Sequence, residues 1–432
     1  MRVLGIGNYN DLGSIYMRCS SSGHEVRVHI SEDGSRDVLR GLVDQEPDLD
    51  AALRWASETD HVLLVEDSGW GAQQDAWRNA GLNVLGSSTL GDRLEQDRAY
   101  GQQVLSDVGL HTLPARTFDR FDEAVVFLQR HRGRYVLKFH GSDLPSNANY
   151  VGMRDDASDM LAMLARERML YQRDGEPEPT FSLMEFVQGV ETGLGAFFDG
   201  NNFVGPINLD WEHKRFFPGN LGELTGEMGT VVSYRGGEKL FAETLARVAP
   251  LLRSGRHVGY VNLNTIINDR GIWPLEFTCR FGYPGFAILS ALFRDDCATI
   301  CRNVARGSGE SFETESGFAV GIVLTVPPFP YHHGYEELGH GQLIHLPDDL
   351  TDHERRHLHF GEVELEDGQL LTAGQVGYVM VVTGNGPTIP AARQAAYTLA
   401  GRIAIPNVRY RNDIGLDLHE RGLAELHRLG WL

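Results

Sequence analysis

Long apolar runs are missing from this 432-residue sequence, and their absence argues against a membrane-spanning helix. No stretch approaches the roughly 18 consecutive apolar residues that such a helix needs. The first residues, "MRVLGIGNYNDLG", become polar too early for a secretory signal. We therefore expect a cytoplasmic protein that has no membrane partner.

Cysteine is also scarce. The four cysteines, Cys19, Cys279, Cys297 and Cys301, have neither disulfide nor zinc spacing. Cys297 and Cys301 lie one helical turn apart without nearby histidines, so we predict that they are core thiols rather than metal ligands. A reducing compartment fits this cysteine usage.

Positive charge is in short supply, with 39 Lys and Arg against 59 Asp and Glu and a formal net charge of −20. This balance argues against nucleic acid as a partner, although a nucleotide needs only a locally basic pocket. Hydrophobic content of 42% and charged content of 23% are typical of soluble globular proteins. The length predicts two to four packed units.

The N-terminal region alternates between strand and helix patterns. Residues 2–8, 24–30 and 61–67 read as strands, and "LGSIYMRCSSSG" after the first of them is helix-like. This alternation predicts a parallel sheet in an α/β protein. The early glycines miss the dinucleotide fingerprint, so a nicotinamide-dependent dehydrogenase remains a minor alternative.

Further along, one lysine interrupts an apolar strand. Lys138 within "YVLKFHG" is either an edge residue that reaches solvent or a buried cation suited to phosphate. The other predicted elements are a helix, turn, short strand and helix over 94–129, two strands over 181–200, a hairpin over 258–277 with the turn "NDRG", strands at 319–326 and 377–384, and a helix over 390–403.

The stretch "PLEFTCRFGYPG" (274–285) ends a predicted buried strand with an unusual set of polar residues. Strand alternation places Glu276, Thr278 and Arg280 on one face. One interpretation is a structural ion pair in which Arg280 neutralises Glu276. The other is a site where Glu276 holds a hard cation and Arg280 binds a phosphoryl oxygen.

Four stretches carry a resemblance to a known family. "EHKRFFPGNLGELTGEMG" (212–229) is similar to the D-H-K-R…T-G-G-M-G segment of phosphoribosylamine–glycine ligases, and "LEFTCRFGYPG" (275–285) to their E-F-N-x-R-F-G-D-P-E. Residues 84–105 match the helix that carries the first ATP lysine, and "YRNDIG" (410–415) matches a motif near the C-terminus. The chain thus resembles this family of the ATP-grasp superfamily over essentially its whole length.

The resemblance implies an α/β protein with the ATP-grasp fold and an α+β lid. It implies an N-terminal pre-ATP-grasp α/β domain at about 1–90, an ATP-grasp domain with a mobile lid at about 91–315, and a small C-terminal domain at 316–432. It also implies ATP and Mg²⁺ (or Mn²⁺) as cofactors. Small-molecule carboxylate and amine substrates, and a monomer or homodimer, are expected.

The resemblance assigns a metal site to the strand end described above. Glu276 corresponds to the carboxylate that bridges Mg²⁺ and the ATP phosphates, and Asn264 on the preceding strand to another oxygen ligand. Thr278 stands where the family has asparagine, a better ligand than a hydroxyl. Arg280 is implied to be catalytic, because it would stabilise charge on the transferring phosphoryl group.

Nucleotide-binding residues follow in the same way. Arg98 and Lys138 correspond to two cations over the α- and β-phosphates. Glu185 and Val187 would offer backbone hydrogen bonds to adenine, and Glu191 a carboxylate to the ribose hydroxyls. A solvated strand is the alternative for both glutamates.

A lysine–arginine pair completes the implied site. Lys214 and Arg215 fit the family's pair near the phosphates, with Lys214 in a catalytic role. A solvated loop is the alternative for both residues.

The departures from the family fall mainly on the substrate side. An N-terminal Gly-Arg-Glu-His is replaced by "YNDLGS" (9–14), which supplies Asp11 and no cation, although Arg18 further on could compensate. The glycine-rich lid loop is replaced by "SDLPSNANYVG" (142–152), and Asp-Pro-Glu by "YPG" (283–285). The family's Gly-Tyr-Pro turn reads "PPFPYHHG" (327–334), where the histidines suggest a solvated loop rather than a zinc site.

We therefore predict an ATP-dependent carboxylate–amine ligase that forms an amide through an acyl phosphate and releases ADP and phosphate. The changed substrate side favours an acceptor other than phosphoribosylamine, because an acid facing a phosphate is repulsive. An authentic phosphoribosylamine–glycine ligase is one alternative. A nucleotide-binding homologue without catalysis is another, suggested by Thr278 and the lysine-free lid loop.

Overall fold

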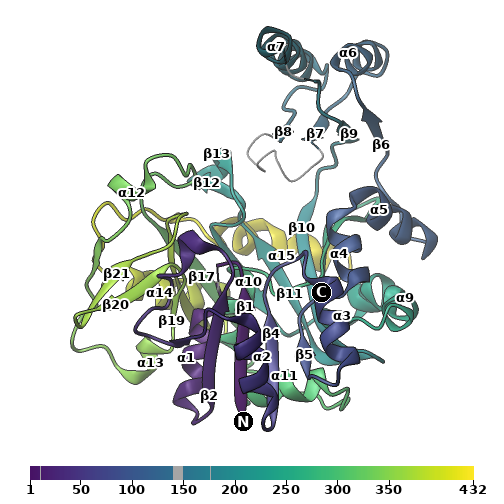
Figure 1. The fold of residues 1–432 in the computed structure, drawn as a ribbon. Coiled ribbons are helices and arrows are strands. Elements are labelled where there is room, and N and C mark those ends of the chain that lie inside the picture. Colours follow the sequence, from purple (N-terminus) through teal and green to yellow (C-terminus); the bar gives the residue numbers. More distant parts are fainter. Residues whose placement is uncertain (10, 140–148, 176) are drawn as a thin grey trace.

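The chain forms a body with two large sheets and a smaller unit that projects from it (Figure 1). The computed structural model describes residues 1–9, 11–139, 149–175 and 177–432. Most of the lid loop singled out in the sequence, "SDLPSNANYVG" (142–152), lies outside the described residues.

The N-terminal sheet is parallel, as the strand–helix alternation predicted. Its five strands run in the order β3-β2-β1-β4-β5. The strands are β1 (Arg2–Gly7), β2 (Glu25–Ile30), β3 (Asp44–Gln45), β4 (His61–Val65) and β5 (Val84–Leu85).

Helices cover both faces of this sheet because its strands are apolar on both sides. Leu63 and Val65 of β4 pack with α2 (Leu49–Ser57) and near α3 (Gly71–Asn79). Leu64 faces the opposite way, toward α1 (Gly13–Ser21). The chain then continues through α4 (Thr89–Gln96) and α5 (Arg98–Asp107).

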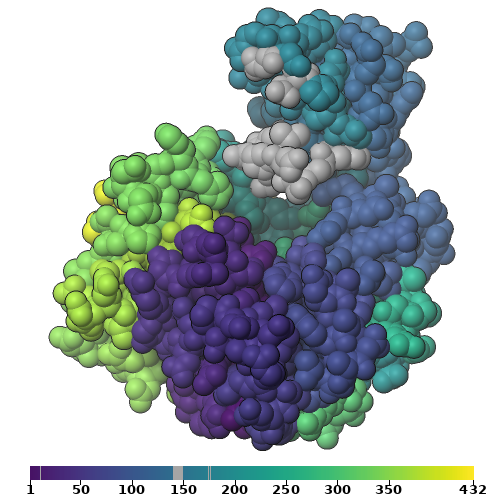
Figure 2. All heavy atoms as spheres, in the orientation of Figure 1, coloured from purple at the N-terminus to yellow at the C-terminus, as the bar shows by residue number. Residues whose placement is uncertain are grey.

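The projecting part, which we call the small unit (residues 115–185), is an antiparallel sheet with two helices. Its strand order is β6-β9-β7-β8, and Figure 2 shows it standing above the body. Phe121, Leu128, Leu164 and Phe181 belong to its own buried apolar cluster. The elements are β6 (Ala115–Phe118), α6 (Phe121–Arg130), β7 (Tyr135–Phe139), β8 (Tyr150–Val151), α7 (Ser158–Asp174) and β9 (Phe181–Glu185).

The second large sheet has eight strands, which run antiparallel in the order β16-β15-β10-β11-β14-β17-β22-β19. Its β15–β16 hairpin pairs Asn268 with Gly271, so the turn predicted from "NDRG" is confirmed. The strands are β10 (Val190–Asp199), β11 (Phe203–Glu212), β14 (Gly229–Ser233), β15 (Val258–Asn268), β16 (Gly271–Thr278), β17 (Phe318–Thr325), β19 (Leu358–Phe360) and β22 (Tyr378–Gly386).

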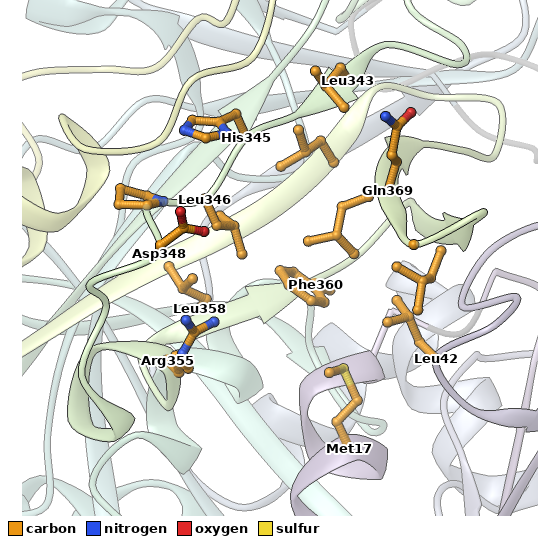
Figure 3. A pocket seen from close by; sticks show the side chains of 15 residues that line it. Met17, Leu42, Leu343, His345, Leu346, Asp348, Arg355, Leu358, Phe360 and Gln369 are labelled. Atoms are coloured by element: carbon orange, nitrogen blue, oxygen red, sulfur yellow. The ribbon is translucent and has the colours of Figure 1, made fainter.

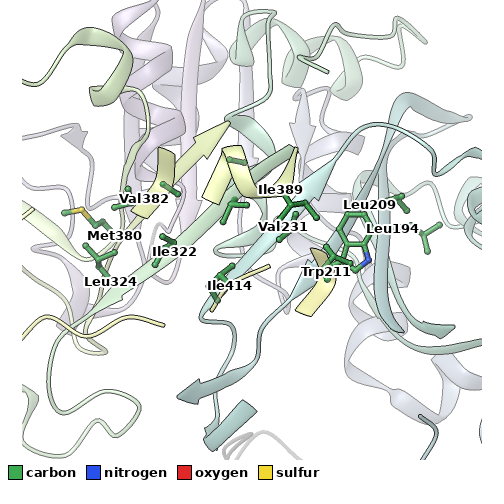
Figure 4. Packing of buried hydrophobic residues seen from close by; sticks show 14 of the residues in the cluster. Leu194, Leu209, Trp211, Val231, Ile322, Leu324, Met380, Val382, Ile389 and Ile414 are labelled. Atoms are coloured by element: carbon green, nitrogen blue, oxygen red, sulfur yellow. The ribbon is translucent and has the colours of Figure 1, made fainter. Parts of the chain in front are cut away.

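This sheet continues across residue 316. Val231 of β14 pairs with Val320 of β17, so the central and C-terminal regions share one ladder. One apolar cluster accompanies it, in which Trp211, Ile322 and Ile389 are almost fully buried (Figure 4). The division of the chain into three domains stays a prediction.

The remaining elements pack on or beside this sheet. All four cysteines are free and buried, as predicted for core thiols. Among the described residues, no helix has both the length and the apolar character to cross a membrane. The helices are α8 (Glu238–Glu243), α9 (Ala249–Ser254), α10 (Gly285–Ser290), α11 (Cys297–Ala305), α12 (Tyr335–Leu338), α13 (Asp352–Arg355), α14 (Ile389–Ala400) and α15 (Leu423–Arg428), and the short strands are β12 (Arg215–Phe217), β13 (Leu221–Leu224), β18 (Leu343–Ile344), β20 (Val363–Glu366) and β21 (Gln369–Thr372).

Candidate active site

Lys214 lies at the centre of a charged cluster on the large sheet. Its Nζ is 3.0 Å from Glu191 Oε1, 3.1 Å from Glu212 Oε2 and 3.5 Å from Glu276 Oε1. Burial lowers the pKa of Lys214, but the three carboxylates outweigh burial and raise the pKa well above its usual value. The ammonium group therefore stays charged and is held by fixed acceptors.

Glu276 is bound by cations from three distant parts of the chain. Its Oε2 accepts a hydrogen bond from Arg98 at 2.8 Å and lies 3.7 Å from Lys138 Nζ. The charges of Lys138, Lys214 and Arg98 hold the pKa of Glu276 far below its ordinary value, despite burial. Burial in turn lowers the pKa of Lys138.

The fold brings these residues together from separate elements. Arg98 begins α5, Lys138 lies on β7 of the small unit, and Glu276 lies near the end of β16. Glu191 is near the start of β10, and Lys214 follows the end of β11. The site therefore lies where the small unit meets the body.

Asn264 supplies an oxygen that no described residue uses. It is 5% exposed and lies directly opposite Glu276 in the β15–β16 register. Its Nδ2 donates to Glu191 at 3.0 Å and to Glu212 at 3.3 Å, while its Oδ1 has no partner. A buried amide oxygen without a donor fits a hard cation, which accepts carboxylate and carboxamide oxygens.

The residues around Asn264 can hold Mg²⁺ in the way this ion prefers. The described chain contains no ready cluster of three or more acidic, histidine or cysteine ligands. Mg²⁺ is usually bound by one or two carboxylates together with phosphate oxygens and water. Glu276 and Glu212 could provide the carboxylates, and Thr278 lies one pair further along the hairpin, opposite Asn262.

Arg280 is positioned by a different acid from the one that its sequence neighbourhood suggested. Its Nε donates to Glu95 Oε1 at 2.9 Å, and the backbone N–H of Cys279 donates to Glu95 Oε2 at 2.9 Å. The charge of Glu95, followed by those of Asp67 and Asp11, raises the pKa of Arg280. The interpretation that Arg280 neutralises Glu276 is therefore wrong, since Arg98 does so.

Three other predicted residues lie outside the charged cluster. Glu185 is exposed at the end of β9, where its backbone N–H donates to Pro114 at 3.1 Å. Val187 is buried in an apolar cluster with Leu113 and Met184, against which Ile266, Trp273 and Leu275 pack. The Arg215 side chain donates to the carbonyl of Gly222 at 2.6 Å, across the β12–β13 hairpin.

The sequence analysis did not single out Glu212, Asp210 or Glu227. Asp210 Oδ2 accepts hydrogen bonds from Asn262 at 2.7 Å and Asn208 at 3.0 Å, and its Oδ1 has no described partner. Alternation along β11 places Asp210 and Glu212 on one face, so the pattern of this strand could have indicated both. Nothing comparable in the sequence identifies Glu227.

A separate apolar hollow lies away from these residues (Figure 3). Its volume is about 590 Å³, and its wall includes Met17, Leu42, Leu358, Phe360 and Leu370. None of the charged residues described above lines it. We therefore do not assign this hollow to the active site.

Two protein-family models match the chain. Residues 96–286 match the phosphoribosylglycinamide synthetase ATP-grasp (A) domain, and residues 319–417 match the C domain of the same synthetase. The fold and the charged site define an ATP-grasp protein, so the predicted fold class is confirmed. Within that superfamily, the chain belongs to the phosphoribosylglycinamide synthetase-like family.

Individual relatives agree with this assignment. The chain is 26% identical to a phosphoribosylamine–glycine ligase of Halalkalibacterium halodurans, with 96% of each chain covered. It is 29% identical to the enzyme of Corynebacterium ammoniagenes, over 79% of this chain and 78% of the relative. The predicted class, an ATP-grasp ligase with ATP and Mg²⁺ as cofactors, is confirmed at the level of the family and replaces the dehydrogenase alternative.

Solved structures support the fold. A phosphoribosylamine–glycine ligase of Thermotoga maritima superposes with a TM-score of 0.70 at 23% identity, over 96% of this chain and 100% of that one. A biotin carboxylase of Campylobacter jejuni gives a TM-score of 0.64 at 12% identity, over 99% and 98%. At these identities, the likeness concerns the fold alone.

Proposed function

We propose that this protein activates a carboxylate with ATP to form an acyl phosphate, which an amine then attacks to give an amide, ADP and phosphate. The observation that carries the proposal is the meeting of Arg98, Lys138 and Lys214 around Glu276, beside the unpartnered oxygen of Asn264. Such a site acts by positioning and neutralising phosphate charge rather than by a protein nucleophile.

The metal residues follow from the same geometry. Glu276, Asn264 and Glu212 would hold Mg²⁺, with Thr278 as a weaker oxygen donor at the end of β16. Bound Mg²⁺ would neutralise charge on the ATP phosphates. Binding of the ion and phosphates would loosen the contacts between Glu276 and its cations, leaving Arg98 and Lys138 to bind phosphate oxygens.

The nucleoside part would lie between the small unit and the body. The apolar cluster around Val187 offers walls for a base, and the backbone of Glu185 and Val187 lies on the segment that joins β9 to β10. Glu191 would turn from Lys214 to the ribose hydroxyls. Arg215, Arg280 and Lys214 would stabilise the transferring phosphoryl group.

The substrates are the finer part of the proposal. The relatives' names favour glycine and phosphoribosylamine over the different acceptor that we expected from the sequence. A different amine is favoured by one structural observation, an acidic recess beside Arg280 that is described in the next subsection. A cytoplasmic location and a monomeric or homodimeric state stay predictions.

ADP release tests this function. The purified protein with ATP and Mg²⁺ is screened over amino acids crossed with amines, including freshly generated phosphoribosylamine. Release that requires both a carboxylate and an amine supports the ligase. ATP binding without any such release would identify the non-catalytic homologue instead.

The first prediction concerns Glu276. Glu276→Gln removes a charge from the metal shell and should lower turnover at least about a hundredfold, or roughly 3 kcal/mol of transition-state stabilisation. The exposed Glu238, on α8, provides the matched control Glu238→Gln, which should retain activity. Full activity of Glu276→Gln at saturating magnesium would contradict the metal assignment.

A further inference from the structure

A recess beside Arg280 collects acidic side chains from three parts of the chain. Asp11 follows β1, Asp67 follows β4, and Glu362 precedes β20. Burial and then the charges of Asp67 and Glu362 raise the pKa of Asp11 to about 7, while Arg280 opposes this shift. No described residue donates a hydrogen bond to the Asp11 carboxylate, although its neighbours Asp67 and Glu362 have donors.

Glu227 reaches this recess from the large sheet and gives an independent indication of a ligand. It is only 5% exposed, and its Oε1 has no hydrogen-bond partner among the described residues. Its backbone is fixed by Tyr378, whose hydroxyl donates to the Glu227 carbonyl at 3.0 Å. A carboxylate oxygen that is buried without a donor is costly unless something else satisfies it.

Tyr283 connects the two sides of the recess. Its ring packs edge-on against Tyr378 with 5.5 Å between centroids, and its hydroxyl is buried without a partner. Burial, together with the nearby charges of Asp11, Glu362 and Glu227, raises the pKa of Tyr283 well above its usual value. Asp11 and Glu227 therefore both face the neighbourhood of the Tyr283 hydroxyl.

The cations near the recess are already committed. Arg280 is bound to Glu95, and Arg18 donates to the carbonyl of Ser290 at 2.7 Å. Arg18 therefore does not supply the compensating charge that the sequence left open. A phosphate dianion placed here would meet carboxylates that lack donors, and like charges brought together at short range cost several kcal/mol.

We propose, on the basis of the ligase function above, that the acceptor is a diamine without phosphate, with one ammonium group bound between Asp11 and Glu227. An ammonium group offers three donors, enough for both carboxylates and the Tyr283 hydroxyl. Its charge also suits a recess in which negative groups outnumber Arg280.

The second amine follows from the chemistry of amide formation. The attacking nitrogen must be neutral to use its lone pair on the acyl phosphate. An amine that remains an ammonium between two carboxylates cannot be that nitrogen, so the acceptor needs another. Glu227 lies close enough to Glu212 and Lys214 for their charges to act on its carboxyl, so a short diamine could extend from the recess toward the phosphates.

Direct binding tests the recess without requiring turnover. The full-length protein loaded with ADP and Mg²⁺ is titrated by calorimetry with 1,4-diaminobutane, butylamine and ribose 5-phosphate. We expect 1,4-diaminobutane to bind at least about tenfold more tightly than butylamine, and ribose 5-phosphate not to bind. Equal affinity for the two amines, or preferential binding of ribose 5-phosphate, would overturn the inference.

Two conservative variants locate the binding site. Asp11→Asn and Glu227→Gln should each weaken 1,4-diaminobutane binding at least about tenfold and leave ADP–Mg²⁺ affinity unchanged, which also shows that the variants fold. Glu238→Gln is the matched control and should bind as the unaltered protein does. Unchanged diamine affinity in both recess variants would refute the assignment.

Failure of this inference can be told apart from failure of the proposed function. If the protein releases ADP with phosphoribosylamine but shows no preference for the diamine, the diamine inference is wrong and the ligase function stands. If the diamine binds at Asp11 and Glu227 but no carboxylate–amine pair releases ADP, the recess is an amine site and the ligase function is wrong.

Discussion

Lys138 illustrates how the surroundings of one side chain decide between two roles that its strand position leaves open. Its Nζ lies 3.7 Å from Glu276 and belongs to the cluster around Lys214, so the side chain does not extend into solvent. Lys138→Ala should weaken ATP binding by about 1–3 kcal/mol, as expected for the loss of a charge-assisted hydrogen bond. Calorimetric titration with ATP and Mg²⁺ measures this change.

The chain offers a matched control for that experiment. Lys239 on α8 donates to the Gly430 carbonyl at 2.7 Å and stacks on Trp431, away from the site. Lys239→Ala should leave ATP affinity unchanged. Equal ATP affinity in Lys138→Ala and the unaltered protein would contradict the nucleotide role.

His257 makes stability depend on pH. It is fully buried, and its Nδ1 lies 2.9 Å from the hydroxyl of Ser88, which caps α4. Burial and then the charge of Arg78 lower the pKa of His257 to about 3. The unfolded chain binds a proton near pH 6.5, while the folded chain does not, so acid favours unfolding.

The expected size follows from that difference. This residue should remove roughly 3 kcal/mol of folding stability as the pH falls from 7 to 4, provided that the fold persists. His257→Gln cannot titrate, so its free energy of unfolding should fall less over the same interval. Denaturant titrations of both proteins at several pH values measure the difference, and parallel pH profiles would count against the prediction.

At the scale of elements, β15 fixes the N-terminal sheet against the large sheet. The N–H of Gly86, just after β5, donates to the carbonyl of Val258 at 3.2 Å. A Cβ at Gly259 would lie 1.7 Å from the carbonyl oxygen of Gly86, so no side chain fits there without movement of backbone. The close contact of these two elements therefore depends on glycine.

Gly259→Ala tests this contact. The clash with backbone should lower the free energy of unfolding by at least about 1–3 kcal/mol, the usual cost of overpacking. Gly282→Ala is the control, because a Cβ there meets nothing within 4 Å. Thermal denaturation of both variants distinguishes them, and equal stability would show that β5 and β15 can separate at little cost.

The elements themselves were largely predictable because each has a strong local pattern. The strands at 61–67 and 258–268, the hairpin turn at 268–271 and the helix near 390–403 agree with the structure to within a few residues. Their periodicity and turn residues act over a few neighbours. What no local pattern indicated was the order of the eight strands, since β10 lies between β11 and β15.

At the scale of the whole molecule, the shared sheet should make the central and C-terminal regions unfold together. A fragment of residues 1–315 would lose β17, β19 and β22, leaving β14 with an open edge and its apolar cluster exposed. We expect this fragment to aggregate or lack fixed side-chain packing. Near-ultraviolet circular dichroism and gel filtration test this, and a monomeric fragment with a native spectrum would show that the C-terminal region is dispensable.

The candidate site could be predicted only in part. Glu276 and Lys214 could be named because they lie in segments that resemble a family, and the structure brings them within 3.5 Å. The pairing of Arg280 with Glu95 was missed because the two residues are 185 positions apart and no local pattern connects them. Glu227 was missed because an acid in a loop has no signal until its burial is known.

The sequence by itself determined the α/β class, the main strands, the β15–β16 hairpin and the presence of a nucleotide-type cluster, because these depend on residue type and short-range spacing. Only the tertiary structure decided which charges meet. Arg98 rather than Arg280 neutralises Glu276, and Arg18 faces Ser290 rather than the recess of Asp11. Electrostatic interactions depend on distance in space and on burial, and both are set by how remote segments pack.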